Sequence, residues 1–187
     1  MLSTQILIPL VIVAAVIVAA LVYMLARKRR SQNLREQFGP EYDHVVQKEG
    51  DVRKGEQLLE FRQKHRKTLN VRPLSQEEQA RFAARWREVQ SQFVDDPSDA
   101  VAVADSLVNE VMQARGYPTN DFTQQAADIS VDHPAVVENY RAANEIAERR
   151  SRGQASTEDL RQAMVHYRAL FSELLEEKQP EQLRKEA

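Results

Sequence analysis

The sequence contains no cysteine, so disulfides, thiolate nucleophiles and iron–sulfur clusters with cysteine ligands are excluded. Aromatic residues make up only 6% of the chain, and β-branched runs outside the N-terminal segment are short, which argues against a sheet-rich fold. The five glycines are scattered singly, so no glycine-rich phosphate-binding loop is present. These absences predict an all-α protein without a thiol-based or loop-bound cofactor.

Positive charge is scarce where nucleic-acid binding would need it. Four of the 26 basic residues precede Ser31 and no acidic residue does, which leaves 22 basic against 28 acidic side chains in residues 31–187. An acidic domain lacks the basic footprint by which proteins hold nucleic acids. We therefore expect no nucleic-acid partner.

The chain has one long run without charge, the twenty residues Ile6–Leu25. At ~1.5 Å per residue, a helix of this length spans roughly 30 Å, the thickness of the hydrocarbon layer. A cleaved signal peptide would have a positive segment before a shorter apolar run, but Met1–Gln5 carries no charge. The run therefore predicts a transmembrane helix over 6–25, with a short extracytoplasmic N-terminus over 1–5 and the lipid bilayer as a partner.

The flanking charges predict the orientation of this helix. Positive residues stay on the cytoplasmic side, and here they all follow the run. We expect a single-pass protein of the plasma (inner) membrane, with its N-terminus outside and its C-terminal domain in the cytoplasm. The predicted membrane-interface residues are Arg27, Lys28, Arg29, Arg30 and Arg35. Within the span, Ala15 and Ala19 form a small-xxx-small pair that could support a weak homodimer.

Residues 26–70 read as a basic juxtamembrane segment and a long spacer helix. The first helix should continue to Phe38, because Gly39-Pro40 stops it. A second helix is predicted from Glu41 to about Leu69, and its sparse apolar residues indicate a mostly solvated element.

Residues 71–177 carry a stronger helical pattern. Ser75 and Glu78 fit a capping box, Asp96-Pro97 fits the start of a second helix, and Gly116 fits its end. A short helix is predicted over Asp121–Asp128, the next is predicted to start at Asp132 and Pro134, and the last at Ser156 or Thr157. The pattern predicts a compact bundle of about five helices over 71–177 and a charged tail over 178–187.

No residue set carries a recognisable catalytic chemistry. None of the four histidines is paired with another at helical spacing, and the carboxylates sit at helix starts and on solvated faces. We predict no catalytic, cofactor-binding or metal-binding residue, and no enzyme activity. Two alternatives stay open: an enzyme with its site among the helices of 75–177, and a nucleic-acid or lipid-surface binder that uses the basic segment 62–72.

The remaining interpretation is an interaction module. We expect a membrane-anchored helical interaction or scaffold protein with a protein partner at the inner membrane. The candidate residues for the partner-binding surface, on the two last helices and just before them, are His133, Tyr140, Arg141 and His166.

Several short sequence segments resemble those of a family of small bacterial proteins. They include Arg115-Gly116-Tyr117-Pro118, Ser130-Val131-Asp132-His133-Pro134 and the stretch Ala155–Arg168. This family is uncharacterised; its members have an N-terminal membrane segment followed by a helical domain, and they are often catalogued as hypothetical or "secreted" proteins. The resemblance implies a bacterial origin and this architecture, and it carries no activity.

Overall fold

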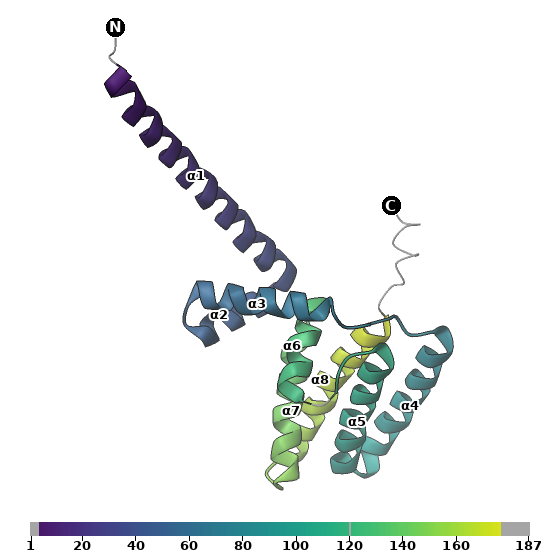
Figure 1. Ribbon diagram of the computed structural model, residues 1–187. Coiled ribbons are helices and arrows are strands. Elements are labelled where there is room, and N and C mark those ends of the chain that lie inside the picture. Colours follow the sequence, from purple (N-terminus) through teal and green to yellow (C-terminus); the bar gives the residue numbers. More distant parts are fainter. Residues whose placement is uncertain (1–3, 120, 177–187) are drawn as a thin grey trace.

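The structure is a computed structural model that describes residues 4–119 and 121–176, with side chains from Val13 onward. The described part of the chain forms eight helices and no strand (Figure 1). The predicted all-α class is therefore confirmed. The predicted charged tail 178–187 and the first three residues lie outside the described part.

Helix α1 (Thr4–Phe38) is a single rod that projects away from the rest of the molecule (Figure 1). It ends at Phe38, directly before Gly39-Pro40, as the sequence predicts. Large apolar side chains on this helix are exposed, each by 50–66%: Val13, Val16, Ile17, Val18, Leu21, Val22, Tyr23, Met24 and Leu25. The side chains of Ile6–Ile12, the first part of the predicted transmembrane run, lie outside the described part. Among the described residues, no helix is both long enough and apolar enough to cross a membrane.

The predicted single helix over Glu41–Leu69 is wrong, because the chain breaks it into two. Helix α2 (Pro40–Glu49) ends at Gly50, whose φ of 66° lies in the left-handed region that only glycine enters without strain. Asp51 then caps helix α3 (Val52–Arg66) by accepting a hydrogen bond of 2.9 Å from the backbone N–H of Lys54. The two helices form a hairpin.

This hairpin packs on its neighbours through one face, while many of its other residues are exposed, in keeping with the mostly solvated element that the sequence predicts. A small core joins the end of α1 to the hairpin; its buried members are Leu34, Phe38, Tyr42, Val45 and Leu59. Val131, on helix α6, packs against this core from the bundle. Residues that looked sparse along one helix thus become contiguous once the chain folds back at Gly50.

The bundle consists of the five predicted helices, α4 (Gln76–Asp95), α5 (Pro97–Arg115), α6 (Phe122–Asp132), α7 (Val137–Ser151) and α8 (Thr157–Glu176). Ser75 and Glu78 form the predicted capping box. Helix α5 is central: it contacts α4, α7 and α8, and its side chains Ala104, Leu107 and Val111 are fully buried. Trp86 of α4 stacks on Phe171 of α8 with ring centroids 4.7 Å apart. The hairpin lies across one end of this bundle (Figure 1).

Helix α6 differs from its prediction. It runs on to Asp132 instead of ending at Asp128, so Asp132 is the last residue of α6 and not the cap of the next helix. Helix α7 starts five residues later, at Val137, without a side-chain cap. The Asp132 carboxylate is engaged elsewhere: Arg66 of α3 and Tyr117, on the loop after α5, both donate to it. These tertiary contacts keep it from acting as a cap.

Candidate functional site

The basic residues after the apolar run lie where α1 meets the hairpin. Arg27, Lys28 and Arg29 are exposed. Arg30 pairs with Glu60 of α3, and Arg35 pairs with Asp43 of α2 at 3.1 Å while its guanidinium lies over the Tyr42 ring. The predicted membrane-interface residues therefore form one cationic collar, with two members tied to the hairpin.

At the end of the bundle that meets the hairpin lies a set of buried and half-buried polar contacts, which we call the junction network: Glu41, Arg62, Arg66, Arg115, Tyr117, Ser130, Asp132, His133, Arg141 and Glu173. Glu41 of α2 accepts hydrogen bonds of 2.7 Å from Arg62 of α3 and from Arg141 of α7. Arg62 also donates to Ser130 of α6 at 3.0 Å. The Glu41 carboxylate thus joins α2, α3 and α7, and Arg62 extends the contact to α6.

Glu41 stays ionised despite its burial. Its side chain is 1% exposed, and burial alone would raise its pKa. The hydrogen bonds and charges of Arg141 and Arg62 outweigh burial, so the pKa of Glu41 lies below its ordinary value. A buried charge of this kind is stable only while both cations remain in place.

The second part of the network centres on Asp132. Tyr117 donates a hydrogen bond of 2.6 Å to its carboxylate, and Arg66 forms an ion pair with it. Burial and the neighbouring Asp132 raise the pKa of Tyr117. Tyr117 is therefore a neutral donor at neutral pH, and it fixes the loop after α5 to the end of α6.

His133 lies in the third part. Nη1 of Arg115 is 3.3 Å from Nε2 of His133 and donates to the carbonyl of Leu174, while Nδ1 of His133 is 3.1 Å from Glu173. A guanidinium can only donate, so Nε2 accepts and Nδ1 carries the proton that bonds Glu173. Burial lowers the pKa of His133, although Glu173 opposes this shift. The imidazole is therefore a neutral connector between α5, α8 and the loop after α6.

The four residues predicted as a partner-binding surface do not share one surface. His133 and Tyr140 are 3% and 1% exposed, and the Tyr140 hydroxyl donates to Gln125 at 3.0 Å inside the bundle. The Arg141 side chain is 18% exposed and engaged with Glu41. His166 is half-buried and bonds Asn139 at 2.9 Å. The two buried residues belong to the interior because their polar atoms find partners there.

The basic segment 62–72 is divided in the same way. Arg62 and Arg66 turn inward to Glu41 and Asp132, and Arg72 pairs with Glu78 at 2.7 Å. Lys64 and Lys67 are exposed. Three of its five cations are thus committed to carboxylates of the same chain.

Sequence reasoning missed Glu41 and Arg115 as organising residues. Glu41 meets Arg141 across 100 positions, and Arg115, which is 0% exposed, reaches Leu174 across 59. Charged residues at helix ends usually face water, so nothing local distinguishes these two.

The hydrogen bonds of the junction network join helices and loops of this chain to one another. In residues 4–119 and 121–176, no group of three or more histidine, aspartate or glutamate side chains could hold a metal ion. The chain matches no protein-family model, no curated protein and no solved structure.

Proposed function

We propose that this protein is a single-pass membrane protein that holds a helical interaction or scaffold domain at the cytoplasmic face of the plasma membrane. The observation that carries the proposal is the exposed apolar surface of α1, where nine large side chains between Val13 and Leu25 have no cover. Apolar surface exposed to water costs about 25 cal/mol per Å², and an apolar patch of this kind marks a contact with lipid or protein.

Lipid is the better cover for this surface. The exposed side chains point to all sides of the helix, whereas a protein partner would cover one stripe. In the sequence the charge-free run begins at Ile6, before the first described side chain, and the basic cluster follows it at Arg27. Acyl chains around the run and headgroups around the cluster would satisfy both parts.

The scaffold part of the proposal is supported by the junction network. The ion pair of Glu41 with Arg141 connects α2 to α7, and the hydrogen bond from Arg62 to Ser130 connects α3 to α6. Such a connection would fix the position of the bundle relative to the bilayer, as a platform for a protein partner requires.

Membrane retention tests the anchor. Membranes of bacteria that express the full chain are washed with alkaline carbonate, and the wild-type protein is expected in the pellet. The variant Ile17→Arg/Leu21→Arg places two charges on one face of the run, at about 2.5–3.5 kcal/mol each near the bilayer centre, and should shift to the wash. Val94→Arg/Val165→Arg, at exposed apolar positions of α4 and α8, is the matched control. A wild-type protein released by the wash would contradict the proposal.

A further inference from the structure

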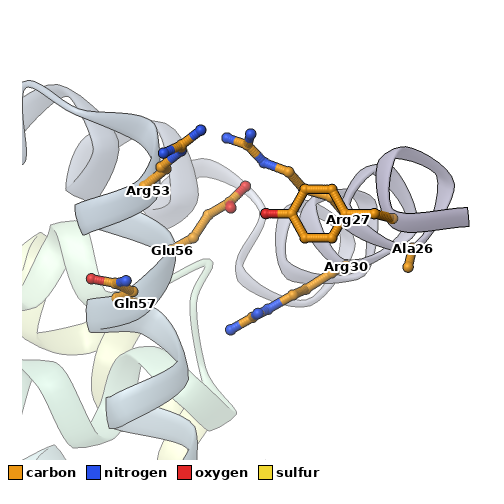
Figure 2. Close-up of a pocket in the computed structure, with 7 residues that line it drawn as sticks. Ala26, Arg27, Arg30, Arg53, Glu56 and Gln57 are labelled. Carbon is orange, nitrogen blue, oxygen red and sulfur yellow. The ribbon is translucent and has the colours of Figure 1, made fainter. Parts of the chain in front are cut away.

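A pocket of about 400 Å³ lies between α1 and the start of α3. Its lining residues are Tyr23, Ala26, Arg27 and Arg30 from α1 and Arg53, Glu56 and Gln57 from α3 (Figure 2). The sequence places Arg53 well outside the basic cluster after the run. Only the fold of the hairpin brings it to that cluster.

Two cations of this pocket are available to an anion. Figure 2 shows the guanidinium groups of Arg27 and Arg53 approaching each other from opposite walls of the pocket. Within the described residues, neither makes an ion pair, whereas Arg30 is paired with Glu60. Two guanidinium groups that face a shared space fit a phosphate, which accepts several hydrogen bonds at once.

The pocket also contains a carboxylate. Glu56 is 8% exposed and accepts a hydrogen bond of 2.9 Å from the Tyr42 hydroxyl. It makes no ion pair among the described residues, and Figure 2 shows its carboxylate directed into the pocket beside the two arginines. A nearly buried carboxylate is stabilised by a cation that also donates hydrogen bonds.

The position of the pocket indicates the source of such a ligand. Tyr23 and Arg27 stand at the end of the apolar run, where a transmembrane helix leaves the hydrocarbon layer and meets the headgroups. Lipid phosphates are the most concentrated anions at that depth.

We propose that this pocket binds the phosphoethanolamine headgroup of a phospholipid, with the phosphate between Arg27 and Arg53 and the primary ammonium at Glu56. The proposal rests on the membrane anchoring proposed above. A choline group has no N–H to donate to Glu56, and a glycerol headgroup brings no cation to it. The carboxylate is thus the specificity element, and the arginines bind the phosphate that all three lipids share.

Lipid retention on the full chain tests the pocket. The protein is inserted into nanodiscs with equal parts of phosphatidylethanolamine, phosphatidylglycerol and phosphatidylcholine, and the lipids that stay bound are identified by native mass spectrometry. The wild type should retain phosphatidylethanolamine preferentially. Arg53→Gln should lower retention about tenfold, as expected for one charge-assisted contact. Lys54→Gln removes the same charge from the neighbouring exposed position and should have no effect.

Glu56→Gln separates binding from a purely structural role. The glutamine carbonyl can still accept the Tyr42 hydrogen bond, so the local fold is retained. Without the carboxylate, the preference should turn from phosphatidylethanolamine to the anionic phosphatidylglycerol. An unchanged preference in this variant would overturn the proposal.

Two further outcomes separate a failure of the proposed membrane anchoring from a failure of the proposed lipid site. If the chain does not enter nanodiscs at all, the membrane anchoring is wrong. If it enters but retains the three lipids equally, the pocket proposal alone is wrong. In a second arm, inorganic phosphate is titrated onto the nanodisc-bound chain; displacement of the retained lipid at low phosphate concentrations would assign the site to a free anion and overturn the lipid proposal.

Discussion

At the scale of single residues, Glu41 shows how one charge becomes structural. It is a helix-start carboxylate of the kind that normally faces water, yet it is enclosed by Arg62 and Arg141. Glu138 provides the contrast, because it pairs with the same Arg141 but its side chain is 71% exposed. An exposed ion pair contributes little because water and salt screen it, whereas breaking a buried pair leaves charge behind.

Glu41→Gln should lower the free energy of unfolding by about 3 kcal/mol, because two partly buried guanidinium groups lose their counter-ion. Chemical denaturation of the full chain in detergent measures this effect. Glu138→Gln makes the same chemical change beside the same arginine and should cost less than about 1 kcal/mol. Equal effects of the two variants would contradict the structural role of Glu41.

The same variant has a pH dependence of known sign. The pKa of Glu41 is lowered by folding, so its contribution is fully present above the unfolded pKa of about 4.3 and is lost as the pH falls through the folded value. The difference between wild type and Glu41→Gln should be constant from pH 7 to about pH 5.5 and shrink below about pH 4.3. A difference that grows on acidification would assign the effect to another group.

At the scale of helices, the hairpin α2–α3 depends on a close approach. A Cβ added to Gly55 of α3 would lie 2.9 Å from Cγ2 and 3.0 Å from Cα of Val46 on α2. Glycine within a helix normally costs about 1 kcal/mol relative to alanine, so this position accepts a poor helix former to let two backbones meet.

Gly55→Ala should therefore destabilise the protein by about 1–2 kcal/mol, the reverse of its usual effect in a helix. In a Val46→Ala background the Cγ2 contact is removed, so the cost should fall by roughly half, which a double-mutant cycle by denaturation measures. A Cβ added at Gly50 would have no atom within 4 Å. The cost of Gly50→Ala, which comes from its positive φ, should therefore be the same with and without Val46→Ala. A stabilising Gly55→Ala would show that the helices do not approach this closely.

At the scale of the whole molecule, the structure is a rod, a layer and a bundle (Figure 1). The rod carries exposed apolar surface, the hairpin layer shares a small core with the end of the rod, and the bundle has the larger core. The junction network is the polar seam between the layer and the bundle. With α1 anchored in a bilayer as proposed, this arrangement would hold the bundle close to the membrane surface.

The orientation of the whole chain has a direct test. A reporter that works only in the cytoplasm, fused after Ala187, should be active, because the cations Arg27–Arg30 follow the apolar run. A reporter that works only outside the cytoplasm should be inactive at the same site. The reverse pair of results would place the domain on the other side of the membrane.

The sequence by itself determined the helical class, the five bundle helices and most of their ends. Ser75 acts through a side-chain cap, and Pro97 and Gly116 act through backbone geometry, each within a few residues, so their effects can be predicted from the local sequence. The charge-free run and the basic cluster that follows it are also visible in the sequence alone.

Only the tertiary structure decided the extension of α6 to Asp132 and the sites, whereas the break at Gly50 rests on local caps at Gly50 and Asp51. Glu41, Arg115 and Arg53 acquire their partners or their pocket from segments far away in the chain. From the sequence, a charged side chain is predicted to be solvated, because only the fold shows whether it is buried beside a counter-ion. Periodicity and capping are local, whereas burial and charge pairing belong to the whole fold.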